Sequence, residues 1–307
     1  MNNNELILGL DIGGTSCKCG VIDADCNIIY KTNIPSVLSA SPDNVLQSIG
    51  NLTNDTIAKF PTIAAIGMGV PGVCSDNKIV NSPNFTALLD IDFYDYYTNH
   101  YSIPFYMDND ANAAAVAELV KGHGTQYNNL IYITLGTGVG GAIVINRQIF
   151  HGTNGGAGEL GHTIIDCNST TNASYRNGTL EEKVGRMGIL SLAKQCITKD
   201  SLLYGNNYDV REVASAANNN DSDSIKCISE VGYYLGIGIA SIATALDIPN
   251  FIIGGGISQS DLLIAVATKT AVARAIPSVA KFLTIKRAKF ISDTGVIGAA
   301  LLTENIN

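Results

Sequence analysis

The stretch "LILGLDIGGTSCKCGVID", residues 6–23, decides the fold. An apolar strand leads into a glycine-rich turn, and a second apolar strand follows it. The same outline returns about half a chain later in "LIYITLGTGVGGAIVIN", residues 130–146. Two copies of this unit predict two similar α/β domains, as a gene duplication would leave them. Chance similarity is the alternative, because the chain holds 31 glycines.

The segments around the two copies alternate between helix and strand signals. Helical spacing occurs in residues 42–60 and in the alanine-rich residues 111–122. Between them, "IAAIGMGVPGV", residues 63–73, is typical of a buried strand that enters a loop. Helices dominate from about 180 to 247, and "PNFIIGGGIS", residues 249–258, adds a strand and a glycine turn.

We expect the two domains to divide near residues 111–128. The last helix, "TGVIGAALLTEN" (294–305), is expected to return to the first domain. This division gives a smaller lobe of residues 1–115 plus about 290–307 and a larger lobe of residues 116–289.

Composition restricts the class of protein. A chain of 307 residues with 46% hydrophobic content can form two domains with their own cores. A net charge of −8 argues against nucleic acid or an anionic membrane as partner, and "MNNNELILGL" lacks the cationic region of a signal peptide. The most apolar segments, such as residues 233–248, fall short of the roughly 18–20 apolar residues of a membrane span. Seven cysteines without CxxC spacing predict mostly small buried side chains. We therefore expect a cytoplasmic protein.

The first glycine turn carries a candidate anion site. Gly13, Gly14 and Thr15 allow amides and a hydroxyl to approach a polyphosphate closely. A carboxylate beside phosphate would be repelled, whereas Asp11 could hold a hydrated Mg²⁺ ion that the phosphates also bind. A plain hairpin in which Asp11 accepts hydrogen bonds from the turn is the alternative. Dinucleotide binding fits less well, because "VID" predicts a strand after the turn and not a helix.

Two further glycine loops could contact the same ligand. The second, "LGTGVGG" (135–141), offers Thr137 as a hydroxyl donor and could grip a phosphate chain from the other side. The third, "IIGGGIS" (252–258), could place Gly254, Gly255 and Gly256 against an adenosine. Taken alone, each loop also reads as an ordinary turn.

The segment "MDNDANAAAVAE" (107–118) places Asn109 and Asp110 directly before a helix. The helix terminus would keep the carboxylate of Asp110 ionised and aimed, which suits a group that orients a substrate hydroxyl and accepts its proton in phosphoryl transfer. The alternative is that Asp110 serves only as the N-cap of the helix.

The segment "GGAGELGH" (155–162) sets Glu159 and His162 three residues apart. A carboxylate and an imidazole can hydrogen-bond neighbouring hydroxyls of a sugar. A buried Glu–His hydrogen bond is the alternative. The other histidines have no comparable company and are expected to be surface or packing residues: His100, His123 and His151.

Taken in order, "DIGGT", "GVPG", "NDANAAAVAE", "LGTGVGG", "GELGH" and "LDIPNFIIGGGIS" resemble the ROK family of sugar kinases over residues 6–300. The resemblance implies an α/β, two-lobed, actin-like and hexokinase-like ATPase fold of duplicated ribonuclease H-like domains, and commonly a homodimer. Within the family the chain is most similar to members that phosphorylate glucose.

The resemblance also implies roles for single residues. Asp110 matches the catalytic base, and the sugar-binding positions are matched by Asn109, Glu159 and His162, with Gly69 and Gly72 of "GVPG" passing beside the sugar unless they form only a strand-end turn. The phosphate contacts are matched by Gly13, Gly14, Thr15, Gly136, Thr137, Gly138, Gly140 and Gly141.

One departure from the family concerns zinc. Many members follow the histidine of GELGH with CxCGxxGCLE, whose cysteines hold a structural zinc, whereas this chain has "NASYRNGTLE" (172–181). Asn172, Ser174 and Thr179 are poor substitutes for thiolates, so we expect no zinc. Packing or hydrogen bonds must then support the loop. Glu181 still falls at the family's sugar-binding glutamate.

The resemblance thus implies an ATP- and Mg²⁺-dependent kinase for the 6-hydroxyl of a hexose, with glucose favoured. N-acetylmannosamine, fructose or allose would use much the same residues, and polyphosphate stays open as the donor. A sugar-responsive repressor or a non-catalytic sensor is the alternative from another class. Such repressors carry a helix-turn-helix segment of several dozen residues, whereas ten residues precede Asp11 here.

Overall fold

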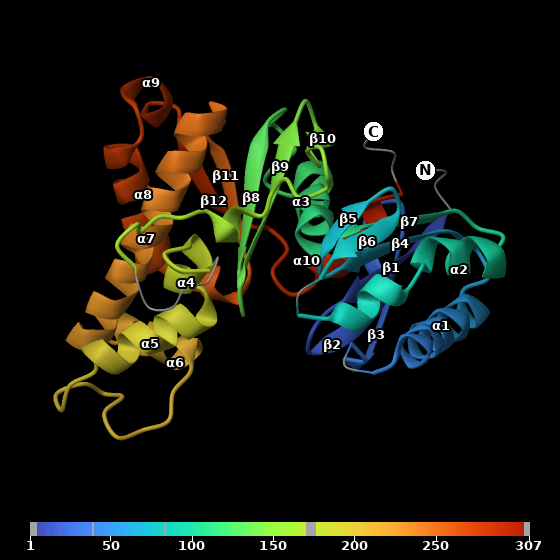
Figure 1. The fold of residues 1–307 in the computed structure, drawn as a ribbon, viewed down its shortest axis with the longest axis horizontal. Helices are drawn as coiled ribbons and strands as arrows, with labels where there is room; N and C mark the ends of the chain where they lie inside the picture. Colours follow the sequence, from blue (N-terminus) through green and yellow to red (C-terminus); the bar gives the residue numbers. More distant parts are fainter. Residues whose placement is uncertain (1–4, 39, 83, 170–175, 304–307) are drawn as a thin grey trace. The chain divides into compact units, whose positions relative to one another are not determined.

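The computed structural model describes residues 5–38, 40–82, 84–169 and 176–303, and these form two compact units (Figure 1). The first unit takes in the described residues up to Asn128, a return segment 143–158, and the residues from Ser292 onward. The second unit consists of residues 129–142 and 159–291. The first unit keeps the whole alanine-rich helix and the return segment. The division expected near residues 111–128 had placed the end of the smaller lobe at residue 115.

The first unit is built on a five-stranded sheet in the order β3-β2-β1-β4-β7. The predicted hairpin pairs β1 and β2 in antiparallel fashion, β3 extends it, and β4 and β7 run parallel to β1. The strands are β1 (Leu6–Ile12), β2 (Ser16–Ile22), β3 (Ile28–Pro35), β4 (Ile63–Val70) and β7 (Phe105–Asn109). A two-stranded hairpin of β5 (Val73–Ser75) and β6 (Lys78–Asn81) follows β4.

The second sheet repeats this connectivity in the order β10-β9-β8-β11-β12. The second predicted hairpin consists of the central strand β8 and its neighbour β9. Strand β11 runs parallel to both β8 and β12. The strands are β8 (Leu130–Leu135), β9 (Val139–Ile145), β10 (Gln148–Ile149), β11 (Asn250–Gly254) and β12 (Thr284–Arg287). The predicted pair of similar α/β domains is therefore confirmed.

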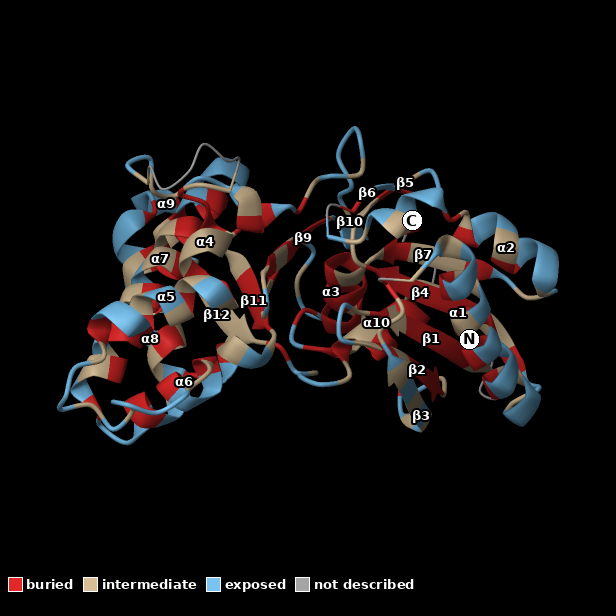
Figure 2. Cartoon of the chain, turned by 60° about the horizontal axis from the view of Figure 1, so that its bottom comes forward, coloured by how far each residue is buried: buried red, intermediate tan, exposed pale blue. Residues whose placement is uncertain are grey.

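Helices cover both faces of the first sheet, so its central strands are buried on both sides (Figure 2). Leu8, Leu10 and Ile12 join a core to which α1 and α2 contribute, whereas Gly9 faces α10. The helices are α1 (Pro42–Lys59), the short η1 (Thr86–Asp90), α2 (Phe93–His100), α3 (Asp110–Lys121) and α10 (Thr294–Leu301). The last helix thus returns to the first unit, as predicted.

The contact between α10 and the sheet depends on close backbone approach. A Cβ atom placed on Gly67 would lie 1.8 Å from the carbonyl oxygen of Ala299. We therefore expect Gly67→Ala to destabilise the first unit by about 3 kcal/mol and to lower the thermal midpoint by about 6–12 °C. Gly156→Ala is the matched control, since no heavy atom lies within 4 Å of its added Cβ. Equal midpoints for both variants in scanning calorimetry would contradict this packing.

The second unit is mainly helical outside its sheet. Its helices are the short η2 (Leu160–His162), α4 (Leu180–Val184), α5 (Arg186–Cys196), α6 (Val210–Asn218), α7 (Ser222–Leu246), the short η3 (Gly256–Gln259), α8 (Asp261–Arg274) and α9 (Pro277–Ala280). Within the described part of the chain, α7 is the one helix long and apolar enough to cross a membrane, and 61% of its most apolar window is buried. It contacts α4, α5, α6 and α8, which is how the core helix of a globular domain packs.

Candidate active site

The carboxyl ends of β1, β4 and β7 meet at one edge of the first sheet. The strand register sets Asp11 beside Gly69, and Gly69 beside Asp108. Asn109 ends β7 and Asp110 begins α3. The structure therefore brings the predicted metal-side carboxylate and the predicted base to the same edge of one sheet.

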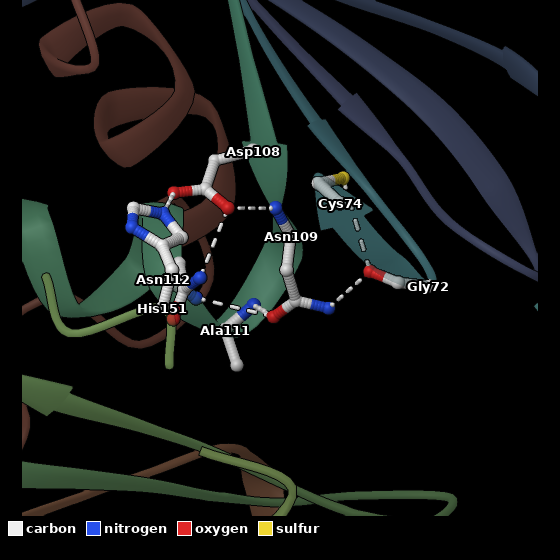
Figure 3. A network of polar contacts seen from close by, with 7 residues as sticks. All are labelled: Gly72, Cys74, Asp108, Asn109, Ala111, Asn112 and His151. Atoms are coloured by element: carbon white, nitrogen blue, oxygen red, sulfur yellow. Dashed lines mark hydrogen bonds and ion pairs between the residues drawn. The ribbon is translucent and has the colours of Figure 1, made fainter. Parts of the chain in front are cut away.

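The turn between β7 and α3 is fixed by Asn109. Its Oδ1 accepts the backbone N–H groups of Ala111 and Asn112 at 2.8 and 3.2 Å, and its Nδ2 donates to the Gly72 carbonyl at 3.0 Å (Figure 3). Asn109 is therefore the N-cap, and the interpretation of Asp110 as the cap is wrong. These contacts use one of the two Nδ2 hydrogens of Asn109, so the other can donate to a further acceptor.

Asp110 occupies the first turn of α3, where the helix dipole favours a negative charge. Its Oδ1 accepts the N–H of Ala111 at 2.8 Å. Burial, together with the charges of Asp108 and Asp110, raises the pKa of the Cys74 thiol well above its usual range. Cys74 is therefore an uncharged side chain.

Asp11 has a cationic neighbour that the sequence analysis missed. Lys18 lies directly opposite Asp11 in the β1–β2 hairpin, and its Nζ is 3.2 Å from Oδ2 of Asp11. The Asp11 side chain is 16% exposed and that of Lys18 38%. Asp11 also packs against Gly295 at the start of α10, where an added Cβ would lie 2.4 Å from its Oδ2. The hairpin register was the signal that could have identified Lys18, because residues opposite each other across the turn face the same side.

The chemistry around Asp11 suits a hydrated Mg²⁺ ion. Such an ion keeps several waters and binds one or two carboxylates together with phosphate oxygens. Within the described ranges no group of three or more His, Cys, Asp or Glu side chains is placed to hold a metal. The single carboxylate of Asp11 would leave most of the coordination shell of such an ion to water and phosphate oxygens. Lys18 adds a positive charge that suits the same phosphates.

In the second unit, the predicted phosphate loop is a tight turn between β8 and β9. The N–H of Gly136 donates to the carbonyl of Gly138 at 3.0 Å, and Thr137 at the tip is exposed. Gly140 and Gly141 lie within strand β9 and not in the turn. Glu181, predicted to bind sugar, packs against Gly138 and accepts the N–H of Val139 at 3.0 Å. Its carboxylate therefore braces the turn.

The third glycine loop offers one open position. Gly254 is buried in β11 against the ring of Tyr132, and Gly255 packs against the Leu135 backbone. Gly256 is exposed, and no heavy atom lies within 4 Å of where its Cβ would be. Of the three predicted adenosine contacts, Gly256 has the most accessible face.

Glu159 and His162 lie on one short turn, as predicted. Glu159 Oε2 is 3.7 Å from His162 Nε2, and their side chains are 45% and 32% exposed. This distance is too long for a hydrogen bond and allows an ion pair at most. The alternative interpretation, a buried Glu–His hydrogen bond, is therefore wrong. Burial raises the pKa of Glu159, the His162 ring opposes this shift and the charge of Glu181 adds to it. The structure thus places Glu159 and His162 side by side on one turn.

The segment that replaces the family's zinc cluster is only partly described. Asn172 and Ser174 lie outside the described residues, whereas Thr179 caps α4 by accepting the N–H of Glu182 at 3.2 Å. Glu182 also accepts the Ser169 hydroxyl at 3.2 Å and the N–H of Gly178. Lys183 pairs with Asp166 at 2.8 Å. These hydrogen bonds and the ion pair support the described residues 166–169 and 176–183, on either side of residues 170–175. The absence of zinc stays a prediction.

Two residues near Asp110, the predicted base, were not recognised from the sequence. His151, expected to be a surface or packing residue without company, is 2.8 Å from Oδ2 of Asp108 through its Nε2 (Figure 3). Both residues line a cavity of about 610 Å³ in the first unit.

His100 is exposed, in agreement with the expectation. The seven cysteines are free, and Cys167 alone is exposed, so the predicted burial of most of them is confirmed.

Comparison with known proteins identifies the family. The ROK family model matches residues 7–306. A glucokinase of Halalkalibacterium halodurans is 32% identical over 312 residues, which cover 97% of this chain and 94% of that protein. The crystal structure of a ROK family glucokinase from Streptomyces griseus in complex with glucose and AMPPNP has a TM-score of 0.82 at 26% identity and covers 96% of this chain and 98% of that one.

The fold is the actin-like, hexokinase-like ATPase fold, which the chain shares with that ROK family glucokinase. The chain belongs to the ROK family. A xylose repressor of Bacillus spizizenii is also similar, with 28% identity over 258 residues that cover 82% of this chain but 65% of that protein.

Proposed function

We propose that this protein is an ATP-dependent hexose kinase that phosphorylates the 6-hydroxyl, with glucose as its main substrate. The position of Asp110 carries the proposal. Its carboxylate stands at the first turn of α3, which Asn109 caps, on the sheet edge where Asp11 lies near the end of β1. Substrates and activities of the relatives support the choice of sugar and nucleotide.

In the proposed reaction the protein positions the sugar hydroxyl against the γ-phosphate and accepts one proton. Asp110 accepts the proton of the 6-hydroxyl as that oxygen forms a bond to the γ-phosphorus, and the bond from this phosphorus to the β,γ-bridging oxygen breaks to release ADP. Asn109, Glu159 and His162 would hold the sugar's other hydroxyls, with Gly69 and Gly72 beside it. The 6-oxygen then has few orientations other than the reactive one.

The nucleotide would be held by the three glycine turns. Gly14 and Thr15 are exposed at the first turn, whose Gly13 N–H donates to the Ser16 carbonyl at 3.1 Å, and they would suit one side of the phosphate chain. The 136–138 turn would suit the other side. Gly256 offers its open face to the adenosine. Mg²⁺, held on the Asp11 side, supplies charge neutralisation of the phosphates when bound. Lys18 would release Asp11 and pair with a phosphate oxygen.

A second class of function rests on the similarity to a xylose repressor. A sensor would bind the same sugar through Glu159 and His162 without turning it over. The presence of Asp110 at a capped helix start favours the kinase, because sugar binding alone does not need a base. We further propose a cytoplasmic homodimer that binds neither nucleic acid nor membrane, in keeping with the net charge of −8.

A panel of sugars tests the assignment. We expect ADP release, measured in a coupled assay, with kcat/KM for glucose at least about tenfold above that for N-acetylmannosamine, fructose or allose. A reversed ranking would replace glucose by the preferred sugar and keep the kinase. Polyphosphate in place of ATP tests the donor. Calorimetric binding of glucose without any transfer would establish the sensor instead.

A further inference from the structure

The segment 150–158 links the two units and is attached to the first one at two points. The chain passes from the first unit to the second between Gly158 and Glu159. The segment closes on itself, because the N–H of Ala157 donates to the His151 carbonyl at 3.1 Å. Gly155, at a φ of +78°, packs so tightly on Cys74 that an added Cβ would lie 2.0 Å from the Cys74 carbonyl oxygen.

The second attachment is the pair of Asp108 and His151. Nε2 of His151 lies 2.8 Å from Oδ2 of Asp108. Asp108 is buried, with 7% of its surface exposed. The other oxygen of Asp108 accepts the N–H of Asn109 at 2.7 Å and Nδ2 of Asn112 at 2.9 Å. Figure 3 shows the carboxylate between the His151 ring and the start of α3. One buried carboxylate therefore joins the linking segment to the turn that presents Asp110.

We propose that the Asp108–His151 pair is a positioning clamp, which holds the turn bearing the base and the segment leading to Glu159 in one fixed relation. This inference rests on the proposed kinase function. Neither residue touches the reacting atoms in the proposed reaction. Asp108 acts through Asn109 and Asn112, and His151 acts through the segment that it anchors. Loss of either partner should disturb the orientation of Asp110 more than the binding of sugar.

The clamp responds to pH through His151. The hydrogen bond to Asp108 raises the pKa of His151, and partial burial opposes the shift. The other titratable side chains that line the same cavity are Cys74, Asp76, Tyr94, Tyr106 and Asp108. A raised folded-state pKa means that the clamp's stabilisation is complete below the unfolded value of about 6.5 and is lost as the pH rises through the folded value. Since the His151 side chain is 47% exposed, solvent limits its strength.

Two variants of His151 separate positioning from simple structure. His151→Phe removes the donor, and we expect kcat to fall about tenfold while KM for glucose changes less than about threefold. His151→Gln keeps an uncharged donor at similar reach. It should recover part of kcat and show no dependence of kcat on the ionisation of residue 151 between about pH 6 and 8. Asp108→Asn, which keeps the side chain's size, should match His151→Phe.

The control is His100→Gln, because His100 is an exposed histidine that contacts the Tyr96 carbonyl on α2 in the same unit. It should leave kcat and its pH profile unchanged. Unaltered kcat in His151→Phe and Asp108→Asn, with thermal midpoints showing both folded, would overturn the clamp. A titration of His151 by NMR is independent of turnover. We expect its pKa to fall towards 6.5 in Asp108→Asn, and an unchanged value would also overturn the clamp.

The two proposals fail in different ways. If the wild-type protein phosphorylates no sugar, the proposed kinase function is wrong, and so is the proposed effect of the clamp on catalysis. The NMR titration would still decide whether the Asp108–His151 pair forms. A wild-type kinase whose His151 and Asp108 variants keep full kcat contradicts the clamp alone.

Discussion

Asp110→Asn is expected to lower kcat by about 10³-fold and to leave the dissociation constant of glucose within about threefold. An amide keeps the acceptor oxygen that contacts the N–H of Ala111, so the start of α3 stays intact. It cannot accept the proton of the 6-hydroxyl at neutral pH. The attacking oxygen would then have to release its proton to water. Coupled ADP release gives kcat, and calorimetry gives glucose affinity.

The matched control is Asp92→Asn. Asp92 also stands at the start of a helix of the first unit, and its side chain accepts the N–H of Asp95 at 2.9 Å. Its loss should weaken α2 slightly and leave turnover unchanged. If the Asp110 variant kept more than about a tenth of kcat, or if glucose binding disappeared with turnover, the assignment of Asp110 as the base would be wrong.

Glu159→Gln should raise KM for glucose by about 10- to 100-fold, with a smaller effect on kcat. A hydrogen bond from a hydroxyl to a charged carboxylate is worth about 1.5–3 kcal/mol, more than one to an amide. Glu159 is also half-exposed, so the change leaves no buried charge behind. Glu230→Gln on α7 is the control, since it removes a carboxylate of the same unit that is outside the proposed site.

The same variant has a distinct pH dependence. Burial holds the pKa of Glu159 above that of an exposed glutamate. On acidification, the Glu159 carboxylate therefore becomes protonated at a higher pH than an exposed glutamate would. The wild-type KM should therefore rise as the pH falls through this raised value, while the KM of Glu159→Gln stays flat in that range. Parallel profiles for both proteins would exclude Glu159 from the sugar contacts.

Local patterns predicted much of the fold. The glycine turns at 13–15 and 136–138 lie between apolar strands, and this local signal was enough to place both hairpins and infer the repeated sheet. The alanine-rich helix was equally clear, although its cap is Asn109 and not the next residue. Both residue types cap well, so propensity alone did not distinguish them.

Contacts between distant segments were beyond such patterns. His151 and Asp108 are 43 residues apart, and nothing in either neighbourhood signals the other. The contact exists because the chain returns to the first unit over residues 143–158, which depends on tertiary packing. Lys18 differs, since hairpin register alone places it opposite Asp11. The bracing of the 136–138 turn by Glu181 again required the tertiary structure.

The most direct test is ³¹P NMR of the product formed from ATP, Mg²⁺ and glucose. We predict one new phosphate monoester whose phosphorus couples to the protons on carbon 6, formed in equal amount to ADP and nearly absent in Asp110→Asn. A monoester on carbon 1, or inorganic phosphate and ADP without any sugar phosphate, would contradict the account.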